Sequence, residues 1–344
     1  MMSFKISNIE ISNQSEPLII AEIGINHNGS LERAIKISEQ AIKSGAKVIK
    51  HQTHIVEDEY SYHAKKIKPG NSKKNIFKII KECSLNEEDE FKLMRYITNR
   101  NRIFISTPFS FKAVDRLVKF KVPAFKIGSG ECNNHILLNY IARQKKPIIM
   151  STGMNDMSSV KKSVKIINKY HNNLALLHCT NVYPSKFESL RLNSILDLKK
   201  KYKKNIIGYS DHSIGIYPSI IAMSLGAQII EKHFIDNKRF KGPDIVCSMD
   251  PSDLKELIKV SKIIKKSIPG HKYLHPSEVV TSRFAFASIV ASKNIKRNEK
   301  FSFKNICPKR PGTGDFLAYD YKKILGKKSR RDILVDEQIK KDDV

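Results

Sequence analysis

The stretch LIIAEIGINHNGSLERAIKISEQAIKSGAKVIKHQTH, residues 18–54, has the pattern of a strand, a helix and a second strand. Its first apolar run ends at a turn at Asn28 and Gly29, and Ser30 can cap a helix whose apolar residues recur at helical spacing. Gly45 stops that helix, and the next apolar run follows at once. Runs of Val, Ile and Leu without strict alternation are typical of parallel strands buried on both faces. The stretch therefore predicts one β/α unit of a parallel sheet.

Short apolar runs that stop on polar side chains recur as far as residue 234. They are LIIAEIG (18–24), VIKHQTH (48–54), RIFISTPF (102–109), AFKIGSGE (124–131), PIIMSTG (147–153), LALLHCT (174–180), IIGYSDH (206–212) and IIEKHF (229–234). Together they predict an α/β fold, the (β/α)8 TIM barrel. Active sites of such barrels lie at the carboxyl ends of the strands, so we expect function at these polar endings.

The length of the chain leaves room for a second domain. It has 344 residues, more than the roughly 250 of one such barrel. We predict a catalytic barrel over residues 1–270, a linker over residues 271–283 and a small β-rich domain over residues 284–344, because polar residues and then short apolar runs divided by turns follow Pro269 and Gly270. A domain of about sixty residues is not very stable unless it docks on something.

Composition narrows the function classes. The chain has 62 Lys and Arg against 34 Asp and Glu, and the resulting net charge of +28 could indicate a nucleic-acid-binding protein. These residues are spread over predicted helix exteriors and turns without a nucleic-acid-binding motif, so we interpret them as solvated surface and expect no nucleic-acid partner. Five cysteines without CxxC spacing favour a reducing cytoplasm. No signal segment and no apolar stretch near ~20 residues is found, so we expect no membrane association.

Two histidines end consecutive predicted strands. His212 closes IIGYSDH and His233 closes IIEKHF, so their rings are expected to be neighbours. Each alone is more simply a hydrogen-bonded strand end, but the pair favours an open divalent-metal site, with Mn²⁺ or Mg²⁺ before Zn²⁺ because no cysteine lies beside them. Four other histidines near this end are interpreted as hydrogen-bonding or packing residues: His27, His51, His54 and His178.

Two lysines lie inside apolar runs, Lys50 in VIK and Lys126 in FKI. A buried ammonium group needs an anionic partner, and a phosphorylated or carboxylated ligand is the simplest candidate. Strand-end hydroxyl and amide groups can complete such a site, although Thr107 and Ser151 taken singly are equally well explained as strand ends. The predicted anion site comprises Lys50, Thr107, Lys126, Ser129, Ser151, Asn181 and Ser210.

Three carboxylates accompany these groups. Glu22 lies in the first run, Glu131 ends the fourth, and Glu231 precedes His233 by two residues. Each can act as a general base, orient a ligand or form an internal ion pair with one of the lysines. The residues alone leave these three roles open.

The chain also resembles a known family, the bacterial N-acetylneuraminate (sialic acid) synthases. The resemblance rests on AEIGINHNGS, KHQTHIVEDE, ISTPFS, KIGSGE, STGM, LLHCTNVYP, IGYSDHSIG, EKHF, GPDIVCSM and KRPGTGDF, which span almost the whole chain in order. It implies a TIM barrel followed by an antifreeze-like (SAF) domain, and a domain-swapped homodimer. It also implies that phosphoenolpyruvate condenses with N-acetylmannosamine and water to give N-acetylneuraminate and phosphate, with a divalent metal and C–O cleavage.

Residue roles follow from this resemblance. His212 and His233 would bind the metal, Mn²⁺ first, with Mg²⁺ or Co²⁺ as alternatives. The predicted anion site would hold phosphoenolpyruvate. Glu131 would activate the attacking water, and Glu22 would lie near the aldehyde oxygen of the sugar. Sugar-binding residues would be Gln52, Asn71, Tyr183, Asp244 and Arg310.

Arg310 has a special place in this expectation. It would reach from the tail of one subunit into the barrel of the other, which would also explain how so small a tail is stabilised. The family pattern has Asn where this chain has Thr313, close to Arg310 and the expected acyl pocket. Thr281 and Phe284 are weaker candidates for tail contacts.

Three hypotheses stay open. HQTHIVEDE and PGN in the long second connection favour N-acetylmannosamine as the sugar. A sister synthase that makes legionaminate or pseudaminate from a diacetamido-trideoxyhexose would use the same phosphoenolpyruvate site, so only the sugar pocket discriminates. A basic nucleic-acid-binding protein with a barrel-like core is the third hypothesis, which the motifs disfavour.

Overall fold

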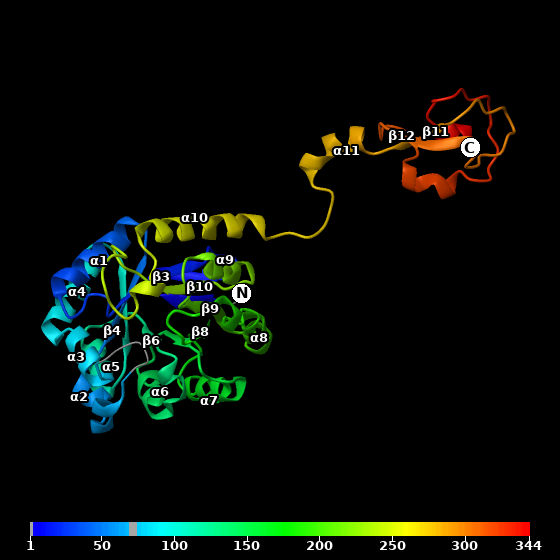
Figure 1. Cartoon of the computed structure of the whole chain (residues 1–344). Coiled ribbons are helices and arrows are strands. Elements are labelled where there is room, and N and C mark those ends of the chain that lie inside the picture. The colour runs from blue at the N-terminus through cyan, green and yellow to red at the C-terminus, as the bar shows by residue number, and fades with distance from the viewer. Residues whose placement is uncertain (1–2, 69–73) are drawn as a thin grey trace. The chain divides into compact units, whose positions relative to one another are not determined.

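The structure is a computed structural model that describes residues 3–68 and 74–344. Eight parallel strands close into a barrel in the order β10-β3-β4-β5-β6-β7-β8-β9 (Figure 1). The strands are β3 (Leu18–Gly24), β4 (Val48–Thr53), β5 (Ile103–Pro108), β6 (Phe125–Ile127), β7 (Ile148–Ser151), β8 (Leu174–Cys179), β9 (Ile206–Asp211) and β10 (Ile229–His233). Each lies within the run that predicted it, so the (β/α)8 barrel is confirmed.

Helices follow the strands on the outside of the barrel. They are α1 (Leu31–Lys43), α4 (Glu87–Thr98), α5 (Phe111–Lys119), α6 (His135–Ala142), α7 (Met157–Ile167), α8 (Ser194–Lys201), α9 (Tyr217–Ser224) and α10 (Pro251–Ser267). Ser30 caps α1 as predicted, since its hydroxyl accepts a hydrogen bond from Arg33 N at 3.2 Å. Gly45 follows α1 with a φ of +100°, a left-handed conformation that favours glycine.

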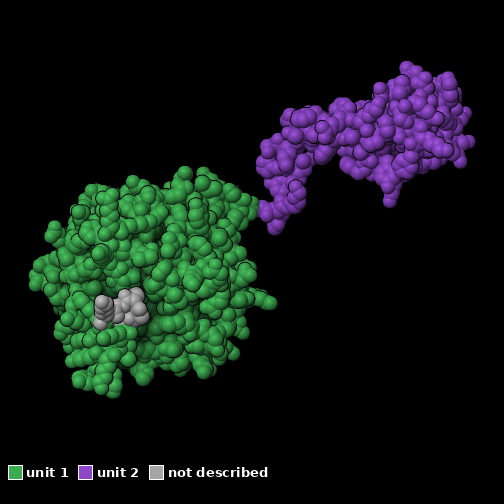
Figure 2. Space-filling view, viewed as in Figure 1, with its two compact units in different colours: residues 1–269 green, residues 270–344 purple. Residues whose placement is uncertain are grey.

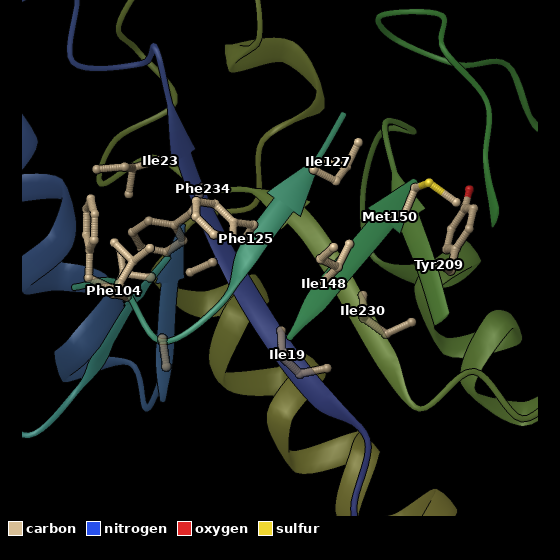
Figure 3. Close-up of a cluster of buried hydrophobic side chains, with 14 of the residues drawn as sticks. Ile19, Ile23, Phe104, Phe125, Ile127, Ile148, Met150, Tyr209, Ile230 and Phe234 are labelled. Carbon is tan, nitrogen blue, oxygen red and sulfur yellow. The ribbon is translucent and has the colours of Figure 1, made fainter. Parts of the chain in front are cut away.

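Strand side chains alternate between two apolar layers. Ile19, Phe125 and Tyr209 belong to the layer between the sheet and the helices, part of which Figure 3 shows. Ile20 and Ile105 belong to the second layer, which fills the barrel interior. The same alternation continues at the carboxyl ends of the strands. There, one residue faces the barrel mouth and the next residue faces the helices.

An N-terminal hairpin contributes to the interior layer. Strands β1 (Ser3–Ile6) and β2 (Ile9–Ser12) pair antiparallel, and Phe4, Ile6 and Ile11 pack in one cluster with interior residues at the amino end of the barrel. This hairpin was not predicted, because strands of four residues are too short for a clear period. Since the hairpin packs at the amino end, the carboxyl end is left for the chemistry.

The long second connection holds several short elements: α2 (Val56–Glu59), the 3₁₀ helix η1 (Tyr62–Lys66) and α3 (Ile76–Cys83). Helix α3 is followed by α4 in the same connection, and α3 has its own N-cap residue. Asn75 caps it by accepting from Lys78 N at 2.8 Å. Asn71, a predicted sugar contact, lies outside the described residues. Further 3₁₀ helices at this end of the barrel are η2 (Gly130–Asn133), η3 (Phe187–Ser189) and η4 (Ile245–Cys247).

The chain divides into two compact units, residues 1–269 and residues 270–344 (Figure 2). The second unit has a small apolar core that includes Ile289, Phe301 and Ile324. Its elements are η5 (Pro276–Glu278), α11 (Val279–Ala285), β11 (Ser288–Ala291), β12 (Ile306–Lys309), η6 (Ala318–Lys323) and η7 (Lys341–Asp343). Helical turns thus occupy part of the segment predicted as a linker. In the described parts of the chain, no helix combines the length and the apolar composition needed to cross a membrane.

Candidate active site

Side chains at the carboxyl ends of the strands surround a cavity of about 1280 Å³. Its polar lining comes from β4, β10 and the segments that follow β3, β4, β6, β8 and β10. Six predicted site residues belong to this lining: Gln52, Glu131, Asn181, Tyr183, His233 and Asp244. The fold therefore brings together residues that are far apart in the sequence.

Lys50 and Lys126 are buried beside a shared carboxylate. Glu231 Oε1 lies 3.8 Å from Lys50 Nζ and 3.5 Å from Lys126 Nζ. Lys50 also forms an ion pair with Glu22, its register partner on the neighbouring strand β3. The structure thus gives each buried ammonium group an anionic partner, as expected. Three roles were left open for Glu22 and Glu231, and the structure shows one of them: both carboxylates form internal ion pairs with the lysines.

These charges act strongly on one another because water is excluded. Burial lowers the pKa of Lys50 to about 7, with Lys126 adding to the decrease and Glu231 opposing it. Burial favours the neutral form of Glu231, but attraction by Lys126 and Lys50 outweighs it and lowers the pKa of this carboxyl. An additional anion near the lysines would favour the charged form of Lys50, so the site is suited to phosphate or carboxylate.

Hydroxyl and amide groups lie around the lysines. Ser210 Oγ donates to Glu231 Oε1 at 3.1 Å, and Ser129 Oγ accepts from Gly153 N at 3.0 Å. A Cβ atom at Gly153 would collide with Ser129 and Asn181, so a side chain there would disturb both. The sequence signal for this close approach is the glycine at the end of PIIMSTG.

Thr107 and Ser151 present a different observation. Both residues are buried, and neither hydroxyl has a hydrogen-bond partner among the described residues. Buried polar groups in proteins are nearly always paired, so each exception needs an explanation. A ligand that accepts hydrogen bonds beside Lys50 and Lys126 would provide it, and this favours the anion site over the strand-end alternative.

His212 and His233 lie side by side, with ring centroids 5.6 Å apart. His212 Nδ1 is 3.0 Å from Thr180 O, a contact that requires a proton on Nδ1 and leaves Nε2 as an acceptor. That Nε2 lies 3.0 Å from Tyr183 Oη. His233 Nδ1 is buried without a hydrogen-bond partner among the described residues, 3.9 Å from Asp244 Oδ2.

Both rings are suited to a metal ion. Burial lowers the pKa of His212 to about 4 and that of His233 well below its usual value, so both are neutral at pH 7. A metal–nitrogen bond of about 2.1 Å would place two rings on one ion roughly 5–6 Å apart, which matches the observed spacing. The described residues contain no group of three or more His, Cys, Asp or Glu that could hold a metal.

Two carboxyl groups of the cavity titrate close to neutrality. Burial raises the pKa of Glu131 to about 7, with a contribution from Glu59 that Lys126 opposes. Burial likewise raises the pKa of Asp244 to about 6. A group that exchanges a proton near pH 7 is suited to general base catalysis, which supports the expectation for Glu131.

Gln52 is held in a chain of hydrogen bonds along the cavity wall. Its Nε2 donates to Glu22 Oε1 at 3.2 Å, and its Oε1 is 3.1 Å from His54 Nε2. His54 Nδ1 lies 2.7 Å from Glu59, and its ring stacks on Phe109 at 4.3 Å. Sequence reasoning missed that Glu59 and Phe109 line the cavity. The acidic run VEDE directly after the second predicted strand was an available signal.

The remaining rim histidines hydrogen-bond, as expected for structural residues. His51 Nδ1 is 3.1 Å from the buried Glu90, and its Nε2 is 3.2 Å from His27 Nε2. His178 Nε2 is 2.7 Å from Leu190 O. His27, His51 and His178 do not belong to the cavity lining.

Arg310 and Thr313 belong to the second unit, residues 270–344. Arg310 is exposed there, whereas the Thr313 hydroxyl accepts a hydrogen bond from Gln338 Nε2 at 3.2 Å. Their predicted part in sugar binding, like that of Asn71, stays a prediction.

Sequence reasoning missed one buried ion pair beside the histidines. Lys232 Nζ lies 3.1 Å from Asp211 Oδ2, and neither side chain is exposed. Each of the two residues directly precedes a histidine, so strand alternation sends it to the opposite face of the sheet. A charged residue at such a helix-facing position was the available signal.

Comparison with known proteins decides the family. A family model matches residues 37–273, and its description is the NeuB family. The chain belongs to the NeuB family. Residues 286–344 match the SAF domain. The sialic acid synthase resemblance, with a TIM barrel followed by an SAF domain, is therefore confirmed.

Several proteins similar to this NeuB-family chain are named as synthases of nonulosonic acids. The N,N'-diacetyllegionaminic acid synthase of Campylobacter jejuni is 37% identical, covering 94% of this chain and 98% of that protein. The pseudaminic acid synthase of the same species is 33% identical, and the match covers 94% of this chain and 96% of that protein. A solved structure is also similar: the crystal structure of the N-acetylneuraminic acid synthetase from Leptospira borgpetersenii in complex with citrate. It superposes with a TM-score of 0.74 at 30% identity, and the match covers 81% of this chain and 94% of that chain.

Proposed function

We propose that this protein condenses phosphoenolpyruvate with N-acetylmannosamine and water to give N-acetylneuraminate and phosphate. The supporting observation is that buried lysines and neutral imidazoles lie close together at the carboxyl ends of the strands, where His233 lines the cavity. A Cβ atom at Gly24 would lie 2.9 Å from Glu22 Oε1 and 3.3 Å from His233 Nδ1. Glu22 also contacts Lys50. The Glu22 carboxylate therefore lies between the lysine half of the site, Lys50 and Lys126, and the imidazole half, His212 and His233.

In this proposal phosphoenolpyruvate binds at the cationic half. Lys50 and Lys126 attract its phosphate and carboxylate groups, beside the shared Glu231 and the Glu22 that pairs with Lys50. The unpaired hydroxyls of Thr107 and Ser151 donate to the same ligand. The remaining hydrogen-bonding residues of the binding site are Ser129, Asn181 and Ser210.

The imidazole half is proposed to hold a divalent ion, Mn²⁺ in preference to Mg²⁺ or Co²⁺. When bound, such an ion acts as a Lewis acid toward the aldehyde oxygen of the open-chain sugar. His212 and His233 supply neutral nitrogen ligands at a compatible spacing. Tyr183 and Asp244 lie beside them and are proposed to orient the sugar, together with Gln52 across the cavity.

The carboxylates are proposed to serve the proton transfers. The methylene carbon of phosphoenolpyruvate bonds to the aldehyde carbon, and the aldehyde oxygen takes up a proton to become a hydroxyl, which leaves positive charge on the carbon that bears the phosphate oxygen. The water that adds next releases two protons in all, which balance the proton on this hydroxyl and one on the departing phosphate. Glu131 removes a proton from the water that adds to this carbon. The resulting tetrahedral intermediate releases phosphate together with the bridging oxygen, so the C–O bond breaks. Glu22 holds Lys50 and Gln52 in place beside the aldehyde.

A diacetamido-trideoxyhexose, which would give legionaminate or pseudaminate, is the second candidate sugar. One wall of the cavity is apolar and is formed by Ile25, Ile76, Ile79, Ile80 and Val246. This sugar carries a methyl group where N-acetylmannosamine carries a hydroxymethyl group, and a second acetamido group where N-acetylmannosamine carries a hydroxyl. Burying these methyl groups against such a wall is favourable. Two similar proteins are named for these products, which supports this candidate as well.

We also propose a domain-swapped homodimer that works in the cytoplasm. The second unit has a small core, and a domain of that size gains stability by docking on another surface. Its exposed Arg310 would then contact the sugar in the barrel of the other subunit. All five cysteines are free, which suits a reducing compartment.

The decisive experiment offers the purified protein phosphoenolpyruvate, Mn²⁺ and one of three sugars: N-acetylmannosamine, its 6-phosphate or a diacetamido-trideoxyhexose. Mass spectrometry identifies the product, and phosphoenolpyruvate labelled with ¹⁸O at the bridging oxygen tests the bond that breaks. We expect the label in phosphate. No nonulosonate from any sugar would contradict the proposed function, and the preferred sugar decides between its two forms.

A further inference from the structure

The ion pair between Asp211 and Lys232 lies directly behind the two histidines of the proposed metal site. Asp211 and Lys232 are register partners on β9 and β10, and His212 and His233 are the next residues along the chain. Neither charged side chain is exposed. Because successive strand residues point to opposite faces, the pair lies on the helix-facing side while the histidines face the cavity.

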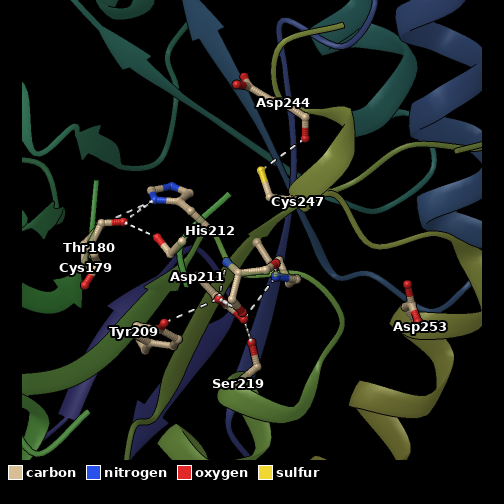
Figure 4. Close-up of polar contacts among 12 residues, drawn as sticks. Cys179, Thr180, Tyr209, Asp211, His212, Ser219, Asp244, Cys247 and Asp253 are labelled. Atoms are coloured by element: carbon tan, nitrogen blue, oxygen red, sulfur yellow. Dashed lines mark hydrogen bonds and ion pairs between the residues drawn. The ribbon is translucent and has the colours of Figure 1, made fainter. Parts of the chain in front are cut away.

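Asp211 has more partners than an ion pair needs. Its Oδ1 accepts from Ser213 N at 2.9 Å and from Ser213 Oγ at 2.6 Å, and its Oδ2 accepts from Ser219 Oγ at 2.6 Å. Tyr209 Oη adds a longer contact of 3.4 Å. Figure 4 shows Asp211 between Tyr209 and Ser219, with His212 directed toward Thr180. The end of β9 is thereby tied to α9, which carries Ser219.

Lys232 holds the same turn from the neighbouring strand. Its Nζ donates to Ser213 O at 2.6 Å. Ser213 is therefore held at its amide nitrogen, hydroxyl and carbonyl oxygen by the two charged residues. His212 lies between Asp211 and Ser213, so its backbone is fixed relative to β10, which carries His233.

A gain in stability alone does not explain charges at these positions. A buried ion pair seldom stabilises a fold more than apolar side chains of the same volume, because desolvation offsets the attraction. Tyr209 and Ile230, two residues earlier on the same strands, belong to the apolar layer at helix-facing positions. Unlike an apolar contact, directed hydrogen bonds from an ion pair fix the relative position of two strand ends.

We propose that Asp211 and Lys232 are positioning residues that hold His212 and His233 at the spacing required by one divalent ion. This inference rests on the metal site of the proposed function. Outer partners of metal ligands typically change metal affinity 10- to 100-fold when they are lost. We expect a loss of that size when the pair is removed.

The test measures Mn²⁺ binding to the full-length protein without substrate, by electron paramagnetic resonance of the free ion. The double variant D211N/K232M removes both charges, so no unpaired ion is buried, and it should raise the Kd about 10- to 100-fold. Ser219→Ala keeps both charges and removes one hydrogen bond to Asp211, and it should raise the Kd roughly two- to fivefold.

A matched control replaces a buried ion pair elsewhere. Glu90 and Arg116 are joined at 3.0 Å and lie on α4 and α5, so E90Q/R116M should leave the Mn²⁺ Kd unchanged. Wild-type affinity in both D211N/K232M and Ser219→Ala would overturn the positioning role, as would an equal loss of affinity in the control. If the wild-type protein makes product but binds no Mn²⁺, the metal site and this inference both fail while the condensation stands.

Discussion

Lys50 and Glu22 form an ion pair at the barrel mouth, with 4% and 2% of their side chains exposed. Glu22 also accepts a hydrogen bond from Gln52, and Glu231 lies 3.8 Å from the same ammonium group. One buried cation is therefore shared by two carboxylates. Removal of Lys50 leaves Glu22 and Glu231 with less compensating positive charge, which should destabilise the fold. It also takes a positive group away from the proposed anion site, and this second effect is measured separately, as ligand binding.

Lys50→Met should lower kcat/KM for phosphoenolpyruvate by about a thousandfold or more, because a main attraction for the ligand is lost. It should also lower the free energy of unfolding by roughly 3–5 kcal/mol, since a buried ion pair is broken on one side. Steady-state kinetics and denaturant unfolding check the two effects. Lys162→Met, at an exposed position on α7, is the control. An unchanged KM for phosphoenolpyruvate would remove Lys50 from the anion site.

His212→Ala and His233→Ala should each abolish turnover while circular dichroism still reports a folded barrel. The reason is that either change leaves the proposed ion with a single protein ligand. His63→Ala, at an exposed position on η1, should retain activity. Full, metal-independent turnover in both the His212 and the His233 variant would rule out the metal site.

Glu131→Gln should separate activity from stability. Glu131 must be ionised to act as a base, so wild-type turnover should decline as the pH falls below about 7. Because its folded-state pKa lies above the usual 4.5, the proton stabilises the fold below pH 4.5, and this stabilisation is lost as the pH rises through about 7. At pH 8 the variant should therefore be more stable than wild type by about 1–3 kcal/mol, yet nearly inactive. A less stable or fully active variant at pH 8 would contradict the assignment.

Ile79→Asn tests the apolar wall. If this wall receives methyl groups of the second candidate sugar, kcat/KM for the diacetamido-trideoxyhexose should fall about tenfold, through KM. The value for N-acetylmannosamine should change by less than about threefold. Ile136→Asn, at a residue of α6 that is 75% exposed, provides the control. Equal losses for both sugars would mean that the wall does not select between them.

Arg310→Ala should raise KM for the sugar more than KM for phosphoenolpyruvate, by about tenfold against less than twofold. The expected reason is loss of a contact to the N-acetyl end of the sugar from the other subunit. Arg297→Ala, at another exposed arginine of the second unit, is the control. Equal increases in both Michaelis constants would count against the proposed contact.

Much of the fold was predictable because its signals are local. The eight apolar runs gave the strands, and Ser30 marks a helix start that the structure shows as a cap. The strands β1 and β2 were missed because they are short, and α11 was missed because its residues looked like a polar linker. These segments depend on what they pack against more than on a periodic pattern.

The sequence by itself determined which residues reach the barrel mouth. Strand alternation and the common direction of parallel strands send Lys50, Lys126, His212 and His233 to one end of a closed sheet, whatever their separation along the chain. Only the tertiary structure decided how these groups are paired: Glu22 with Lys50, Tyr183 with His212, and Asp211 with Lys232 behind the histidines. The physical reason is that the face of a residue follows from a local period, whereas its partners depend on distances of a few ångström between segments that meet only after the barrel closes.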